Sequence, residues 1–219
     1  MERFVPKWQG QDWPAGGARA LHVYAVPDLA AHPELAELVG ESHKAMAAFP
    51  IIPMTSTLHC TVEMVADTTS DRITPAERST LAEALHRHLA GTGPIRVTVG
   101  SPVATRAGAY LDCHPDDELV ALRRRVRDAI SETRGPGALL HDGGRPHLTL
   151  GYAFDTASSD ALQTELRRIS PSHAPLGIGG VELLDVLWHP RPGPDGRPAW
   201  ELSWEPVATV PLRGQRPAG

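Results

Sequence analysis

The chain has 219 residues, of which 41% are hydrophobic and 21% are charged, enough to bury one sizeable core or two small fused lobes. Its net charge of −5 argues against a broad surface that follows the phosphates of a long nucleic acid, whereas a small nucleotide or one RNA end is compatible with it. Cys60 and Cys113 form no Cys-x-x-Cys pair, which favours a reducing cytoplasm, and no apolar run approaches the roughly 20 residues of a membrane span.

The first predicted elements are a strand, a helix and an apolar loop. Residues 1–20 are expected to form an N-terminal arm, whose Trp8 and Trp13 either pack onto the body or stack a base. Residues 21–26 alternate and are rich in β-formers, which predicts the first strand. A helix should begin near Pro33. Residues 49–53 should then form an apolar loop.

Three further helices are predicted. Residues 74–77 form a capping box with proline at the first helical position, and the helix should end at Gly91. Carboxylates at 116–118 suit the start of a second helix. Apolar residues of this helix recur at helical spacing and should be buried. Its arginines within residues 123–127 are most simply a solvated face, with guidance of a polynucleotide as the alternative. The last helix should span residues 159–170.

Strands are predicted at residues 95–99, 109–113, 178–187 and 200–212. Pro206 should mark an edge strand or a bulge in the last of these. The tail, residues 213–219, is expected to be disordered. Because strands and helices alternate irregularly, the fold class is α+β, with helices on the outer faces of the sheets.

Two short stretches within strand-like runs repeat one pattern. Residues 59–62 read His-Cys-Thr-Val and residues 147–150 read His-Leu-Thr-Leu, and no other histidine fits. Residues i and i+2 of a strand share a face, so each stretch places an imidazole beside a hydroxyl and turns the residue between them toward a core.

Such a pair suits phosphodiester chemistry without a metal. One imidazole can take a proton from the attacking water while the other protonates the departing oxygen. The threonine hydroxyls can donate hydrogen bonds to the non-bridging phosphate oxygens. The alternative is that both histidines are ordinary half-buried strand residues.

The paired motifs resemble the signature of the 2H phosphoesterases, which include the bacterial 2'-5' RNA ligase-like proteins and the cyclic nucleotide phosphodiesterases. The resemblance implies one bilobal domain, residues 21–212, with antiparallel-rich sheets facing a central cleft. It also implies a 2',3'-cyclic phosphate of a nucleotide or RNA end as substrate, a 2'-phosphate as product, and 2'-5' ligation as the reverse reaction. A provisional assignment makes His59 the acid and His147 the base, with Thr61 and Thr149 as oxyanion donors.

Three further residues are candidates for substrate contact. Arg145 lies two positions before His147, so strand alternation places it on the catalytic face, although a solvent-facing loop arginine is the alternative. Tyr152 has the opposite parity and reaches the cleft only if the strand bulges. Phe49 and the loop after it could wall a base site.

Other chemistries lack their patterns, so neither metal nor cofactor is expected. His86 and His88 are two apart on a predicted helix and point to nearly opposite sides. Phosphate-binding loop and nucleophile-elbow motifs are missing. The enzyme alternative is hydrolysis of 2'-5' oligonucleotides or another small phosphodiester. The non-enzyme alternative is a silent nucleotide- or RNA-binding module, with no obligate protein partner and no membrane contact in either case.

Overall fold

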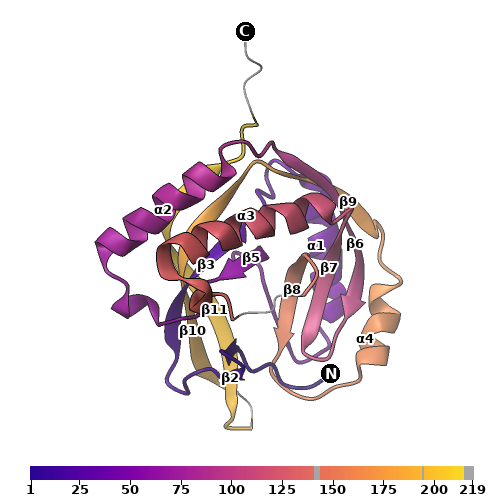
Figure 1. Ribbon diagram of the computed structural model, residues 1–219. Helices are drawn as coiled ribbons and strands as arrows, with labels where there is room; N and C mark the ends of the chain where they lie inside the picture. Colours follow the sequence, from indigo (N-terminus) through magenta and orange to yellow (C-terminus); the bar gives the residue numbers. More distant parts are fainter. Residues whose placement is uncertain (141–143, 194, 215–219) are drawn as a thin grey trace.

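The computed structural model describes residues 1–140, 144–193 and 195–214 (Figure 1). Nine strands form one sheet in the order β11-β10-β3-β5-β8-β7-β6-β9, with β4 paired beside β8, and β1 and β2 form a separate small sheet. Every pairing is antiparallel. The strands are β1 (Lys7–Trp8), β2 (Gln11–Asp12), β3 (Ala18–Ala25), β4 (Ile51–Pro53), β5 (Cys60–Met64), β6 (Ile95–Ala104), β7 (Gly108–His114), β8 (His147–Ala153), β9 (His173–Ile178), β10 (Gly180–Pro192) and β11 (Pro198–Pro211).

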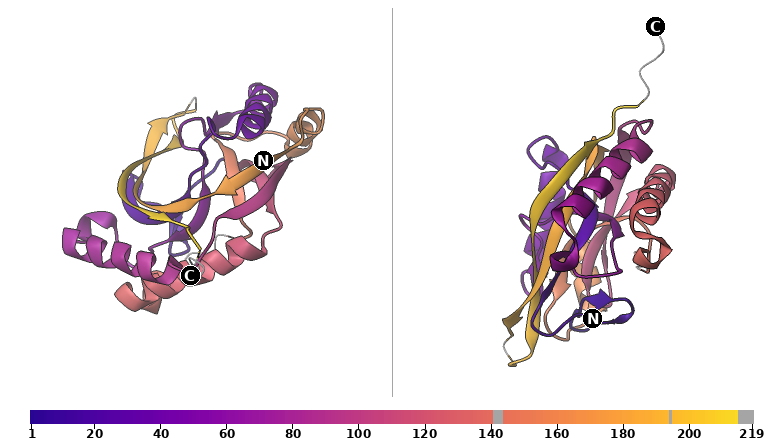
Figure 2. Two further views of the ribbon diagram at one scale, coloured as in Figure 1. Left: turned by 90° about the horizontal axis from the view of Figure 1, so that it is seen from above. Right: turned by 60° about the vertical axis from the view of Figure 1, so that its left-hand side comes forward.

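The helices divide between the two halves of this sheet. Helices α2 (Pro75–Leu89) and α3 (Asp117–Arg134) pack together over β11 and β5, while α1 (Pro33–Met46) and α4 (Ser159–Leu166) pack together over β9 and β6. Figure 2 shows these two helix pairs apart from each other around the curved sheet. No helix among the described residues is long and apolar enough to cross a membrane. The fold is therefore α+β, as predicted.

The two halves of the sheet meet at the two motifs. Cys60 of β5 pairs with Leu148 of β8, and the N–H of Thr149 donates to the carbonyl of His59 at 3.3 Å. Because these are the residues on which the sequence pattern rests, the junction between the halves places the motifs side by side.

Local sequence signals locate most of the helices. Helix α1 begins at Pro33, and α2 carries the predicted capping box between Thr74 and Glu77. Helix α4 ends at Leu166 rather than at residue 170, and Ile169 is only partly buried. Pro171 excludes only residue 170 from helical geometry, so it explains why the predicted end was too late but not why the helix already ends at Leu166.

Strand boundaries depart further from the prediction. Strand β6 continues to Ala104 through an irregular register between Val99 and Pro102. Strands β4 and β9 were not predicted: each contains a proline, which an edge position or a short strand tolerates. The register shift of β11 lies beside Pro206, which confirms the predicted bulge. Residues 215–219 of the predicted disordered tail lie outside the described residues.

Two apolar clusters occupy the two faces of the sheet. The larger one lies under the helices and takes Leu21 and Val23 from β3. The smaller one is rich in aromatic side chains and takes Ala20 and Tyr24 from the opposite face of the same strand. Trp13 of the N-terminal arm belongs to this smaller cluster, so the arm packs onto the body as one predicted alternative had it.

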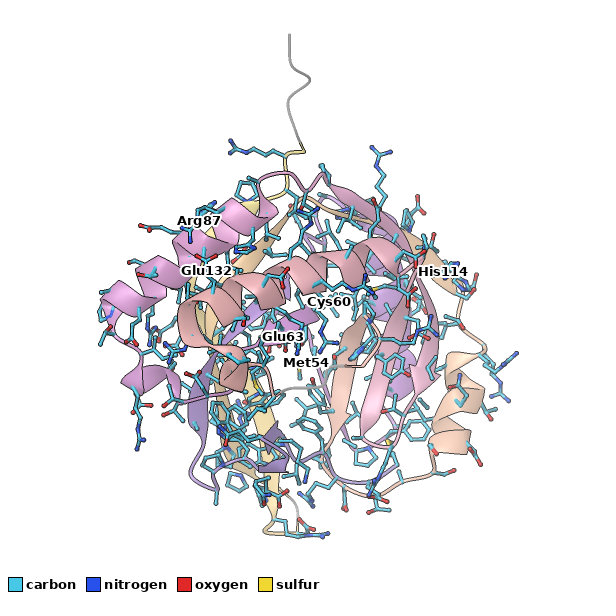
Figure 3. All side chains as sticks on the ribbon, in the orientation of Figure 1. Met54, Cys60, Glu63, Arg87, His114 and Glu132 are labelled. Carbon is cyan, nitrogen blue, oxygen red and sulfur yellow. The ribbon has the colours of Figure 1, made fainter. Side chains whose placement is uncertain are left out.

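The arginine run of α3 is not simply a solvated face. Arg123 donates to the carboxylate of Glu63 at 3.3 Å, and Arg127 forms a second ion pair with the same carboxylate. Glu63 has no exposed side-chain surface, and Figure 3 shows it beneath α3 near Cys60. The two guanidinium groups turn inward because a fully buried carboxylate needs a compensating charge.

Replacing Glu63 by glutamine should lower the free energy of unfolding by roughly 3 kcal/mol, the lower end of the cost of breaking a buried ion pair, because both guanidinium groups stay partly exposed. Glu132 is the matched control: it pairs with Arg87 and His88 at the surface, and its side chain is 47% exposed. Glu132→Gln should change urea unfolding little. Equal losses in the two variants would contradict the assigned difference in burial.

Candidate active site

One cavity of about 490 Å³ opens on the face of the sheet opposite the large cluster. His59 and Thr61 of the first motif and His147 and Thr149 of the second all line it. The residues between them, such as Cys60 and those that follow in each motif, belong to the large cluster on the other face. Strand alternation and the β5–β8 junction together bring the four polar side chains into one cavity.

The rings of His59 and His147 are each oriented by a hydrogen bond to a backbone carbonyl. The Nδ1 atom of His59 lies 2.6 Å from the carbonyl oxygen of Thr57, and that of His147 lies 2.8 Å from the carbonyl oxygen of Arg145. A carbonyl oxygen only accepts, so each Nδ1 must carry the proton and donate it. In the neutral form each Nε2 therefore keeps its lone pair, ready to take up a proton.

The two imidazoles differ in burial. His59 is 1% exposed, and its ring stacks on Tyr24 with centroids 4.2 Å apart. Burial lowers the pKa of His59 to about 4, aided by the charge of nearby His147 and opposed by the hydrogen bond to Thr57. His147 is only half-buried and lies 4.8 Å from the ring of Tyr110. His59 is therefore neutral at physiological pH in the free protein.

A β-bulge follows the threonine in each motif. Tyr24 pairs with Thr61 and Val23 with Glu63, which leaves Val62 unpaired. The register between β7 and β8 shifts in the same way. Each bulge reverses the parity of the residues after it.

The reversed parity adds one residue from each strand to the cavity. Met64 lines it from β5 and Tyr152 from β8, the latter as the sequence allowed on condition of a bulge. Leu150 is the residue left unpaired in β8. Burial raises the pKa of Tyr152, against a smaller opposing effect of its hydrogen bond with Thr149.

Two proposed substrate contacts lie elsewhere. Arg145 is not among the lining residues; its side chain is 76% exposed, and its guanidinium group pairs with Asp116 at 3.1 Å. Phe49 is also absent from the lining and packs against the large apolar cluster. Neither side chain has the placement that the sequence suggested for it.

Several lining residues carried no recognisable signal. His22 of β3 lines the cavity, is 4% exposed, and has its Nδ1 atom 3.1 Å from the carbonyl of Ala20. The N-terminal arm contributes Phe4 and Lys7, and also Trp13, for which the sequence had left base stacking open. Alternation places His22 on the same face as the residues two positions before and after it. No local pattern indicates that this face lines the cavity rather than the core.

Across residues 1–140, 144–193 and 195–214, no group of three or more His, Cys, Asp or Glu side chains is arranged to hold an ion. The expectation of metal independence stays a prediction.

Solved structures share this fold at low sequence identity. TT0787 of Thermus thermophilus matches with a TM-score of 0.61 and 15% identity over 90% of this chain and 100% of that one. E. coli LigT in complex with NADP+ matches with a TM-score of 0.57 and 12% identity over 90% and 98%. LigT in complex with 3'-AMP matches with a TM-score of 0.56 and 12% identity over 90% and 99%.

The family itself is identified from the sequence. Among curated proteins, none matches the chain. The model of the 2'-5' RNA ligase superfamily matches residues 55–185, which contain both motifs and more than half of the chain. The resemblance to the 2H phosphoesterases is therefore confirmed: the chain belongs to the 2'-5' RNA ligase superfamily.

Proposed function

We propose that the protein is a metal-independent phosphodiesterase that opens a 2',3'-cyclic phosphate of a nucleotide or RNA end by acid–base catalysis with His59 and His147. One observation carries the proposal. Two imidazoles with the same Nδ1 anchor line one cavity. Two threonine hydroxyls line the same cavity and can serve as oxyanion donors.

The proposed step moves two protons. The base takes one from a water molecule, whose oxygen attacks phosphorus, and the bond to the 3'-oxygen of the ribose breaks. The acid gives its proton to that departing oxygen, so the product is a 2'-phosphate with a free 3'-hydroxyl. Thr61 and Thr149 donate hydrogen bonds to the non-bridging oxygens as negative charge grows on them.

The difference in burial favours His59 as the base. An acid must hold a proton at the start of the step, and a pKa of about 4 leaves His59 without one at neutral pH. His147 is more exposed and then serves as the acid. This reverses the provisional assignment made from the sequence, which had no information on burial.

The volume of the cavity and the ligands of the similar solved structures support a small nucleotide as the substrate. A volume of about 490 Å³ lies within the range of pockets that enclose one small organic ligand. The LigT structures that share the fold hold NADP+, 3'-AMP and ATP. The net charge of −5 also favours a short substrate over structured RNA.

Loss of either histidine should remove most of the turnover. His59→Ala and His147→Ala should each lower kcat on nucleoside 2',3'-cyclic phosphates by about 10²–10⁴-fold, because both groups act in one displacement. The double variant should be far less than multiplicatively worse. Thr61→Val and Thr149→Val should each cost less, about 10–100-fold.

His86→Ala is the matched control, since this exposed histidine of α2 does not line the cavity. It should leave kcat unchanged. If both cavity variants kept wild-type turnover on every cyclic phosphate while nucleotide binding persisted, the protein would be a binding module rather than an enzyme.

The pH dependence of kcat/KM should identify the base. With His59 as the base, activity should fall as pH drops toward about 4, because protonation removes the lone pair of the free enzyme. The alkaline limb should come from the acid losing its proton. His59→Ala should abolish the acidic limb of the residual rate, and loss of the alkaline limb instead would restore the reverse assignment.

Chelation should leave the rate unchanged. No ligand set for a catalytic ion was recognised in the sequence, so dialysis against EDTA should alter neither kcat nor KM for a cyclic phosphate. Loss of turnover that one added divalent metal restores would show that the reaction uses an ion. Melting curves of treated and untreated protein separate such an effect from simple unfolding.

A further inference from the structure

The N-terminal arm forms one wall of the catalytic cavity. Seven of the lining residues lie between Phe4 and Trp13. This segment lies outside residues 55–185, which match the family model. This wall therefore comes from a part of the chain that the family model does not match. Its side chains are placed to contact a substrate that is bound between the two motifs.

Contacts along its length hold the arm in place. The N–H of Phe4 donates to the carbonyl of Ala153 at 2.7 Å, and the amide of Gln9 donates to the carbonyl of Ala66 at 2.5 Å. Arg3 binds both carboxylate oxygens of Asp195 at 2.8 Å. The arm is therefore positioned from both halves of the sheet and from the β10–β11 turn.

An aromatic surface joins the arm to the second motif. Phe4 stacks on Tyr152 with centroids 4.0 Å apart, and both rings contact Trp188 at 5.2 and 5.3 Å. All three residues line the cavity. Tyr152 comes three positions after Thr149, so this surface begins next to the place proposed for the phosphate.

Trp13 adds a hydrogen-bond donor that has no acceptor. Its side chain is 3% exposed and lines the cavity, yet its indole Nε1 has no hydrogen-bond partner within the described residues. An unpaired buried donor costs free energy, which a ligand acceptor can recover on binding. Trp200 has an equally unpaired, buried Nε1 in the same apolar cluster but does not line the cavity.

We propose that the arm forms a subsite for the nucleobase of the substrate, in which the aromatic ring lies against Phe4 and Tyr152 and an acceptor atom on its edge binds the indole N–H of Trp13. The inference rests on the proposed function for the phosphate end alone. A base fits both observations, because it has a flat apolar face and ring nitrogens or carbonyls at its edge.

A second phosphate group fits this wall less well. Lys7 is the only lysine or arginine among the described arm residues that line the cavity, and its ammonium group is already in an ion pair with Asp12. A flat aromatic surface and a neutral indole N–H favour an uncharged ring over an anion.

Trp13→Phe and Trp200→Phe form the matched test, since each removes one unpaired indole N–H and keeps an aromatic ring. Calorimetry would measure binding of adenosine 2'-monophosphate and of glycerol 2-phosphate, which has no base. Wild type should bind the nucleotide more tightly than the glycerol compound. Trp13→Phe should weaken nucleotide binding about three- to tenfold, the value of one hydrogen bond, and leave glycerol 2-phosphate unchanged. Trp200→Phe should change neither.

Equal affinity of the wild type for the two ligands, or equal effects of the two variants, would overturn the base subsite. Phe4→Leu gives a second reading if Trp13→Phe does not fold: it should weaken only the nucleotide, and equal weakening of both ligands again rejects the subsite. Turnover is scored separately. If the wild type binds the nucleotide selectively but opens no cyclic phosphate, the subsite is retained and the proposed function is rejected. If it opens cyclic phosphates but binds both ligands equally, the proposed function is retained and the subsite is rejected.

Discussion

The cavity that both motifs line depends on how the two halves of the sheet are joined. Strands β5 and β8 share the Cys60–Leu148 pair and a hydrogen bond from Thr149 to His59. Since the paired residues lie inside the motifs, the contact that unites the halves also sets the spacing of the two imidazoles. Each ring is then oriented by its own backbone, through the carbonyl two residues earlier.

The β-bulges let one strand serve two environments. Up to Thr61, alternation sends polar residues to the cavity and apolar ones to the core. After the bulge at Val62 the parity reverses, so Glu63 enters the region under α3 while Met64 reaches the cavity. The buried carboxylate then binds Arg123 and Arg127, which connects α3 to the strand that carries the first motif. Without the bulge, the carboxylate would point into the cavity, where it would repel the phosphate of the proposed substrate.

Local patterns predicted the family, most helices and the shared face of each motif, because helix spacing, caps and strand alternation depend on residues close in sequence. Features that depend on residues distant in sequence could not be predicted. Arg123 looked solvated because Glu63 lies 60 residues away, and the role of Tyr152 depended on a bulge that only the pairing with β7 defines. Arg145 followed the correct parity but lies before the strand, where it turns to Asp116. Nothing local in Phe4 indicated a place in the cavity, and for Trp13 the sequence left packing and base stacking both open.

The contacts of the arm with the β10–β11 turn also affect the order in which the walls of the cavity form during synthesis. Arg3 binds Asp195 and the carbonyl of Pro198, contacts that span 192 and 195 residues. Chains grow from the N-terminus, so the arm emerges before both motifs, whereas its anchor in the β10–β11 turn emerges after them. Both motifs can pair while the arm holds its contacts to Ala66 and Ala153 but still lacks its contacts with the β10–β11 turn. A ribosome-bound chain that already holds both histidines therefore lacks one anchor of this cavity wall, which forms only with the β10–β11 hairpin.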